Sequence, residues 1–183
     1  GFVAVKSIFK QLGEDALGII YFAMTISAVF CAFFEMGICS TVVREVSAYF
    51  QTEPAYIRNL IKTASLLYWG AYLFLAVGVY FVAPLLVEKW IHVKNMDAST
   101  AVWMLRILGI TMLLNLPRSL YTSLFQGLQR MEFNNIVTVC VLGLQQFGVA
   151  IILVFGGALS HVVYWLAACS VLYILICLFI SAR

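Results

Sequence analysis

The stretch LGEDALGIIYFAMTISAVFCAFFEMGICSTVVREVSAYF, residues 12–50, decides the fold of this chain. From Ala16 to Val43 it contains a single charge, Glu35, among apolar and small residues. A helix rises about 1.5 Å per residue and the hydrocarbon core of a bilayer is about 30 Å thick, so this run is long enough to cross a membrane. The stretch therefore predicts a membrane-spanning helix over residues 16–50.

The remainder of the chain repeats this plan of long apolar runs separated by short charged turns. Hydrophobic residues make up 64% of the 183 residues and charged residues 10%, whereas about 25% of a soluble domain is charged. The composition predicts an all-α, polytopic transmembrane helix bundle that forms a single domain over residues 1–183. The net charge of +3 is too small and too scattered to indicate a nucleic-acid partner.

The apolar runs predict about five full spans plus the end of a first one, and we therefore expect the chain to be a piece of a longer protein. Gly13 lies in the expected turn at residues 12–15, where a left-handed glycine ends a helix. Pro84 is expected to kink or stop its helix near the end, and Pro117 to kink or break the next one. The predicted helices cover residues 1–11, 16–50, 55–87, 100–129, 135–155 and 160–181.

Lysines and arginines give the expected orientation, because they are enriched on the cytoplasmic side of membrane proteins. We expect the side with more of them to be cytoplasmic, and the protein to be a multi-pass protein of the plasma (bacterial inner) membrane. Six lie toward one side and four toward the other: Arg44, Arg58, Lys62, Arg118, Arg130 and Arg183 against Lys6, Lys10, Lys89 and Lys94.

Cations, amides and one acid are the polar groups inside the apolar runs, and they form the candidate substrate-binding set. Two guanidinium groups suit a pyrophosphate, since each binds phosphate oxygens in bidentate fashion. Twelve residues correspond to about 120° around a straight helix, so the two arginines need the kink to share a face. The candidates are Arg106, Arg118, Asn115, Gln145 and Gln146, with Glu35 as a coupling or structural acid.

Each charged candidate also has a simpler interpretation. Arg106 is six residues into its predicted helix and can extend its long side chain back to the nearer interface. Arg118 can serve as a cytoplasmic anchor, and Glu35 can lie at headgroup level. Gly37 begins a stripe of small residues, with Ser40 or Thr41 and Ala48, that would let a neighbouring helix approach closely.

Catalytic and metal-binding patterns are not visible. The five cysteines lie inside apolar runs without a CxxC pair, and the two histidines are far apart, so we expect no metal site and no disulfide. Nucleophilic catalysis needs a Ser or Cys beside a His and an acid, and no phosphate-binding glycine loop precedes a helix. The sequence therefore indicates that this chain is not an enzyme and needs no cofactor.

Three motifs resemble the family of polysaccharide and O-antigen flippases. The segment LGEDALG at residues 12–18 is similar to the family's LG-x-E-x-(Y/F)-G turn, with Leu17 in place of an aromatic residue. Residues 34–38 (FEMGI), followed by Val43-Arg44-Glu45, resemble its (F/L)-D-L-G segment and R-E pair, with Glu35 in place of Asp. Residues 124–130 (LFQGLQR), which include Gln126, Gly127 and Arg130, resemble its LQGLQR link, followed by Asn134 or Asn135.

The resemblance implies the N-terminal lobe of a two-lobe transporter with a V-shaped central cavity. Such flippases move undecaprenyl-diphosphate-linked oligosaccharide across the membrane by alternating access, and a proton or sodium gradient is a possible driving force. Arg106 and Arg118 would then contact the diphosphate, and Asn115, Gln145 and Gln146 the sugars. The partners implied are the lipid-linked oligosaccharide, the lipid bilayer, the C-terminal lobe of the same protein and the polysaccharide polymerase machinery.

Two other functions stay open on the sequence. Cation-coupled multidrug export, found in the same superfamily, would favour buried carboxylates, and this chain offers at most one inside its runs. A membrane-embedded lipid-headgroup transferase would need acidic metal ligands at a membrane face, where only Glu88 and Asp97 share a loop.

Overall fold

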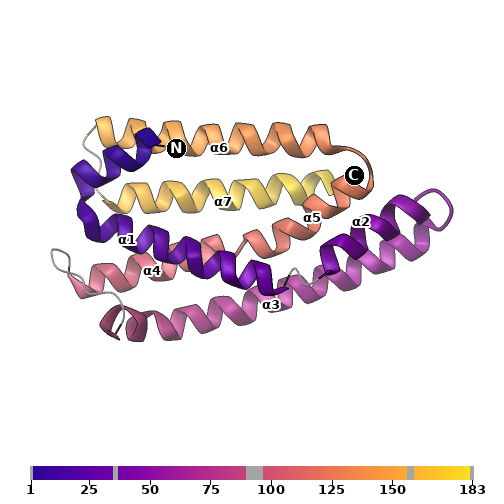
Figure 1. The fold of residues 1–183 in the computed structure, drawn as a ribbon, viewed down its shortest axis with the longest axis horizontal. Helices are drawn as coiled ribbons and strands as arrows, with labels where there is room; N and C mark the ends of the chain where they lie inside the picture. The colour runs from indigo at the N-terminus through magenta and orange to yellow at the C-terminus, as the bar shows by residue number, and fades with distance from the viewer. Residues whose placement is uncertain (1, 35–36, 90–96, 156–158, 182–183) are drawn as a thin grey trace.

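The computed structural model describes residues 2–34, 37–89, 97–155 and 159–181, and its side-chain packing is described for residues 17–34, 37–89, 97–155 and 160–179. These residues form helices without any strand (Figure 1). The helices are α1 (Phe2–Phe34), α2 (Ile38–Tyr49), α3 (Pro54–Lys89), α4 (Ala98–Met112), α5 (Asn115–Gly127), α6 (Met131–Val154) and α7 (Leu159–Ser181).

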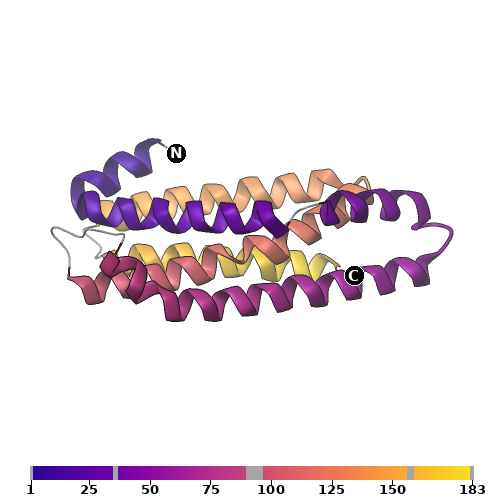
Figure 2. The ribbon, with the colours of Figure 1, turned by 60° about the horizontal axis from the view of Figure 1, so that its bottom comes forward.

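The expected turn at residues 12–15 is wrong, because α1 is helical from Phe2 to Phe34. Gly13 therefore does not end a helix. A glycine inside a helix costs only about 1 kcal/mol relative to alanine, and the apolar run on its C-terminal side keeps the segment helical. Figure 2 shows that α1 bends between a short N-terminal arm and the long part that follows the bundle.

The expected single helix over residues 16–50 is also wrong, because it is divided into α1 and α2. Gly37 has φ +86°, a left-handed conformation that interrupts the helix and that glycine adopts at little cost. The carbonyl of Gly37 accepts hydrogen bonds from the Thr41 amide at 2.9 Å and from the Ser40 hydroxyl at 2.8 Å, and these bonds start α2. Glu35 lies outside the described residues.

Two prolines behave differently in their helices. Pro84 lies inside α3, which continues past it to Lys89 and is not stopped. Pro117 lies in the first turn of α5, and the predicted helix over residues 100–129 is interrupted just before it, at Leu113 and Leu114. The first turn of a helix tolerates proline, because the amides there have no partner within the helix.

Five stretches of the described chain are long and apolar enough to span a membrane, and the protein is a multi-pass membrane protein. The α4–α5 segment is the central one, since 44% of its most apolar stretch is buried inside the bundle, against 22–33% for the other spans. It contacts α1, α3 and α7 through α4, and α2, α3 and α7 through α5. The five stretches are Leu17–Phe34, Pro54–Lys89, Ala98–Gly127, Met131–Val154 and Ser160–Phe179.

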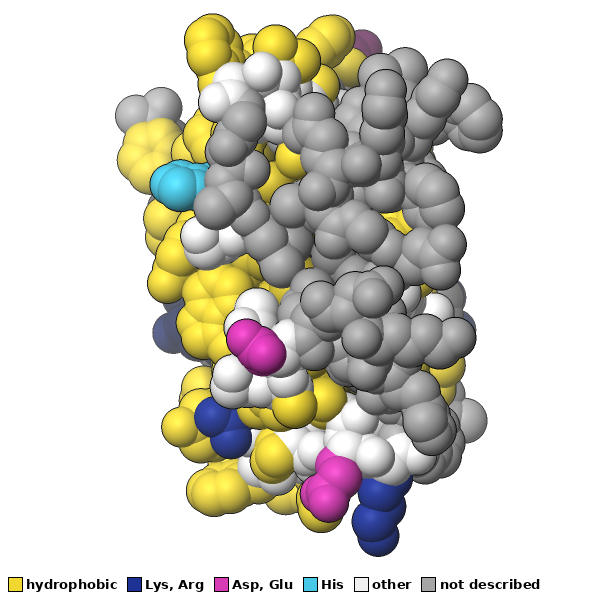
Figure 3. All heavy atoms as spheres, turned by 90° about the vertical axis from the view of Figure 1, so that its left-hand side faces the viewer, with side chains coloured by type: hydrophobic (Ala, Val, Ile, Leu, Met, Phe, Trp, Pro, Cys, Tyr) yellow, Lys and Arg dark blue, Asp and Glu magenta, His cyan; other side chains and the backbone are white. Residues whose placement is uncertain are grey.

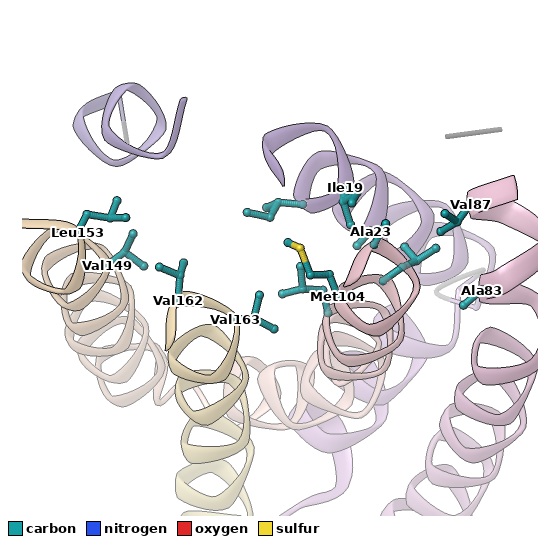
Figure 4. Packing of buried hydrophobic residues seen from close by; sticks show 13 residues of the cluster. Ile19, Ala23, Ala83, Val87, Met104, Val149, Leu153, Val162 and Val163 are labelled. Atoms are coloured by element: carbon teal, nitrogen blue, oxygen red, sulfur yellow. The ribbon is translucent and has the colours of Figure 1, made fainter. Parts of the chain in front are cut away.

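A buried apolar cluster holds one half of the bundle together around Met104 of α4 (Figure 4). Ile19 and Ala23 of α1 point toward Met104, and residues of α3, α6 and α7 complete the cluster. Burial of this apolar surface is not the main driving force in a bilayer, so the cluster acts through close packing. Its other labelled members are Ala83, Val87, Val149, Leu153, Val162 and Val163.

Apolar side chains also cover much of the outer surface, as a lipid-facing protein requires. Leu66, Phe74 and Phe155 are 78%, 77% and 86% exposed. From the end that carries the α3–α4 and α6–α7 connections, the described surface is mostly apolar with few charged groups (Figure 3). The α2–α3 and α5–α6 turns and the end of α7 lie at the opposite end (Figure 1), and Arg58, Lys62 and Arg130 lie on elements that begin or end there.

Candidate functional site

A cleft of about 680 Å³ lies between the broken segments and the last two helices, within the membrane-spanning part of the lobe. Hydroxyl and amide side chains dominate its polar lining, and Arg118 is the charged residue among the described residues that line it. Its polar residues are Ser27, Thr111, Asn115, Arg118, Ser119, Thr122, Ser123, Gln126, Gln145 and Ser170, and Cys31 and Cys39 add two thiols.

The interruption between α4 and α5 opens onto this cleft. The Leu116 amide donates to the carbonyl of Leu113 at 3.0 Å, one residue short of the regular α-helical partner, which would be Met112. The carbonyl of Met112 instead accepts a 2.8 Å hydrogen bond from Ser27 of α1, a side chain only 3% exposed. Ser27 thereby satisfies a buried backbone acceptor that the interruption leaves free.

The interruption between α1 and α2 borders the same cleft and is stabilised in a similar way. Tyr68 of α3, which is 1% exposed, places its hydroxyl 3.5 Å from the carbonyl of Phe34, where it donates, and 3.3 Å from the Cys39 sulfur. Cys39 in turn lies 3.7 Å from the Ser119 hydroxyl of α5. The interruption between α1 and α2 is therefore linked through Tyr68 and Cys39 to Ser119 of α5, and Cys39 and Ser119 line the cleft.

Arg118 enters the cleft from the second turn of α5. Its Nη1 donates to the Asn115 Oδ1 at 3.3 Å, and its Cζ lies 3.8 Å from the centre of the Tyr173 ring. Among the described residues the only ion pair joins Arg44 and Glu45, so Arg118 has no carboxylate partner there. A guanidinium in a membrane-embedded cleft without an acidic partner can bind an anion.

Tyr173, which sequence reasoning missed, connects Arg118 to α6. The ring is 4% exposed, and its hydroxyl donates to Asn134 Oδ1 at 3.2 Å and lies 3.0 Å from the Thr138 hydroxyl. Thr122 of α5 also donates to Asn134 Oδ1, at 3.5 Å. No signal in the sequence indicated this role, because Tyr173 lies toward the end of its apolar run, where membrane tyrosines are common.

Arg106 lies elsewhere and does not line the cleft. Its Nε donates to the carbonyl of Tyr80 in α3 at 3.1 Å, and its Cζ lies 4.3 Å from the centre of the Tyr80 ring, a residue that is 48% exposed. The structure therefore separates the two arginines, and no clamp of both forms within this lobe. The interruption at residues 113–114 changes the relation of α4 to α5 without bringing Arg106 and Arg118 together.

The three amide candidates also fall into two groups, inside and outside the cleft lining. Asn115 and Gln145 line the cleft, whereas Gln146 is exposed and does not line it. Asn115, Arg118, Gln145 and Tyr173 also line a small recess of about 40 Å³ between α5, α6 and α7. Among the described residues, no group of three or more His, Cys, Asp and Glu side chains is placed to hold a metal ion.

The motif glycines Gly127 and Gly37 differ in whether they allow a close contact between helices. A Cβ atom at Gly127 would lie 2.8 Å from Val46 Cβ and 3.1 Å from the carbonyl oxygen of Val43, so the glycine permits the close contact of α5 with α2. The expected small-residue stripe on α2 does not make this contact, because Gly37, Ser40, Thr41 and Ala48 are exposed. The buried residues of α2 are instead Val42 and Val46.

The remaining described motif residues lie in two places. Gln126 lines the cleft, and Arg130 lines a second cavity of about 1110 Å³ near the α2–α3 and α5–α6 turns. Arg44, whose side chain is 77% exposed, pairs with Glu45 at 3.0 Å, and Glu45 also accepts a 3.3 Å hydrogen bond from Tyr56 of α3. The R-E pair thus connects α2 to α3 at this end of the bundle.

Comparisons with known proteins place the chain in a family. Searches of curated proteins and of solved structures gave no match. A family model described as polysaccharide biosynthesis protein matches residues 1–183, and that family includes flippases. With its membrane-spanning bundle and its cationic, hydroxyl-lined cleft, this chain belongs to the polysaccharide biosynthesis protein family.

Proposed function

We propose that this chain is the N-terminal lobe of a two-lobe transporter that flips undecaprenyl-diphosphate-linked oligosaccharide across the bacterial inner membrane. Export of this kind supplies O-antigen, exopolysaccharide or capsule synthesis, and the transporter works by alternating access. The observation that carries the proposal is Arg118, a cation without an acidic partner among the described residues, in a cleft lined by hydroxyls and amides.

The chemistry of the cleft matches the two parts of such a substrate. A guanidinium binds phosphate oxygens through charge-assisted hydrogen bonds, and in a low-dielectric site these bonds are stronger than in water. Sugars present hydroxyls that exchange hydrogen bonds with the serine, threonine and amide side chains around Arg118. Asn115 and Gln145 are the amides that we assign to sugar contacts.

Two of the candidate residues do not line this cleft. Arg106 and Gln146 lie outside its lining, and the substrate would meet them only along another face of the lobe. Glu35 adjoins the interruption between α1 and α2, and we propose it as the acid that couples transport to a proton or sodium gradient. The polysaccharide polymerase machinery is the proposed partner on the product side.

The test is substitution of Arg118 in the full-length protein. Arg118→Ala is expected to abolish polymer export and to lower flipping of lipid-linked oligosaccharide in proteoliposomes about 100-fold, since loss of a charged contact of this kind costs about 3 kcal/mol, within the usual range of about 2–5 kcal/mol. Arg118→Lys keeps the charge without the bidentate geometry and is expected to retain partial activity. Full export by Arg118→Ala, at normal protein levels in the membrane, would refute the binding role.

The alternative functions have different outcomes. A multidrug exporter would give resistance to several cationic drugs when expressed, and Arg118→Ala would leave this resistance intact. A lipid-headgroup transferase would show turnover of a lipid substrate that depends on a divalent metal ion. Either result with the purified full-length protein would replace the flippase proposal.

A further inference from the structure

We propose that Tyr173 is the residue that positions Arg118 for a phosphate group, through a stacked contact that α6 holds in place. The inference rests on the proposed function, because it assigns the anion-binding geometry of the same cleft. It adds a residue that lies outside all three sequence motifs and that does not line the large cleft itself.

The stacked geometry leaves the hydrogen-bonding edge of the guanidinium available. An arginine has five N–H donors, all in the plane of the group. Arg118 Cζ lies over the Tyr173 ring, 3.8 Å from its centre, and this contact is made with the π face of the ring and not with a hydrogen-bond acceptor atom. Asn115 Oδ1 accepts from Nη1 at 3.3 Å. Among the described residues, Asn115 is the one hydrogen-bond acceptor of this guanidinium, and Arg118 lines the cleft.

The tyrosine hydroxyl fixes the ring. It donates its single hydrogen to Asn134 Oδ1, so the Thr138 hydroxyl at 3.0 Å is the donor in their contact. The ring is thus attached to two successive turns of α6, while Thr122 of α5 joins the same Asn134 oxygen. Donation by the phenol also raises the electron density of the ring, which strengthens its attraction for a cation.

Positioning of this kind raises affinity because it removes a cost of binding. A free arginine side chain must lose rotamer freedom when a ligand orders it, whereas a stacked one is already ordered. Loss of the Tyr173 ring would also enlarge the 40 Å³ recess that Arg118 borders, and the guanidinium would then have room to turn away from the cleft.

The chain contains a matched control. Tyr80 stacks on Arg106 in the same manner, at 4.3 Å, outside the cleft. If Tyr173→Leu acts only by loosening the bundle around this buried side chain, it will weaken binding of the diphosphate and of undecaprenol alike. If Tyr173 positions a ligand-binding cation, only Tyr173→Leu will weaken phosphate binding.

The experiment measures binding to the purified full-length protein with undecaprenyl diphosphate and, separately, with undecaprenol, which lacks the phosphates. Tyr173→Leu is expected to weaken binding of the diphosphate about tenfold, with undecaprenol binding unchanged. Tyr173→Phe keeps the ring and is expected to stay within about threefold of wild type, and Tyr80→Leu within about twofold.

A double-mutant cycle separates this inference from the proposed function. In the Arg118→Ala background, Tyr173→Leu is expected to cause no further loss of diphosphate affinity, because the two residues act as one unit. If Arg118→Ala alone leaves diphosphate affinity unchanged, the proposed function fails. If Arg118→Ala weakens it but Tyr173→Leu does not, or if the two losses are additive, only the positioning role of Tyr173 is overturned.

Discussion

The two halves of the broken 98–127 segment are built alike and face different surroundings. In α4, Arg106 contacts the ring of Tyr80 in α3, and Gly109 allows close contact with Val79, which also lies in α3. In α5, Arg118 stacks on Tyr173 of α7, and Gly127 allows close contact with α2. An arginine on a tyrosine is therefore not itself a site. The hydroxyl-lined cleft around the second pair distinguishes it from the first.

The largest predicted difference between α4 and α5 is the effect on transport of removing the arginine of each helix. We predict that Arg118→Gln lowers flipping of lipid-linked oligosaccharide about 100-fold, whereas Arg106→Gln lowers it less than about threefold, because only Arg118 has its guanidinium in the cleft. Initial flipping rates in proteoliposomes, at equal amounts of reconstituted protein, provide the comparison. Equal losses in the two variants would mean that the cleft does not define the site.

A second comparison concerns the two glycine contacts. Gly127→Ala places a methyl group against both the Val46 side chain and the Val43 backbone, and the backbone cannot move aside. Gly109→Ala meets only the Cγ1 atom of Val79, at 2.8 Å. We predict that Gly127→Ala costs about 1–3 kcal/mol and Gly109→Ala less than about 1 kcal/mol.

Thermal unfolding of the purified variants in one detergent measures this difference. A larger loss of melting temperature in Gly109→Ala than in Gly127→Ala would show that the α3–α4 contact is the tighter of the two.

The hydrogen bond from Ser27 to the interruption between α4 and α5 gives a third prediction. Ser27→Ala removes the donor to the Met112 carbonyl and leaves a buried acceptor unsatisfied, at a cost of about 1–2 kcal/mol. Ser47→Ala is the matched control, because its hydroxyl bonds to carbonyls of its own helix at an exposed position, and we expect no measurable loss. Unfolding of both variants under the same conditions checks the difference, and equal stabilities would show that Ser27 does not support the interruption.

The smallest expected effect separates the adjacent glutamines. Gln145→Ala removes one neutral hydrogen-bonding group from the cleft and is expected to weaken binding of lipid-linked oligosaccharide about three- to tenfold. Gln146→Ala changes an exposed side chain outside the cleft lining and is expected to leave binding within twofold. Affinities for the same labelled substrate compare the two, and a stronger effect at position 146 would place the sugar contacts on a different face.

Sequence reasoning predicted the membrane-spanning bundle well, because hydropathy over about 20 residues depends little on tertiary contacts. The interruption before Pro117 also follows from local chemistry, since proline has no amide hydrogen. The interruption at Gly37 was missed, because glycine is common inside membrane helices and only its φ of +86° reveals the break. Gly13 gave the opposite error, since its helix continues.

The members of the site were harder to predict than the spans. Helical spacing gives the angle between Arg106 and Arg118 only for a straight helix, and the segment is broken between them. Which of two adjacent glutamines enters the cleft cannot be assigned until the neighbours of α6 are known. Tyr173 was missed because its role depends on Asn134, Thr138 and Arg118, which come from two other helices.

The interruption at residues 113–114 has a mechanical consequence. In an unbroken helix, rotation about the axis at one end is transmitted to the other through the regular ladder of amide bonds. That ladder is irregular here, since the amides of Leu114 and Leu116 bond to carbonyls only three and not four residues back. Because α5 packs chiefly on α2 and α3, the position of Arg118 relative to the bilayer depends on those helices and not on α4 alone.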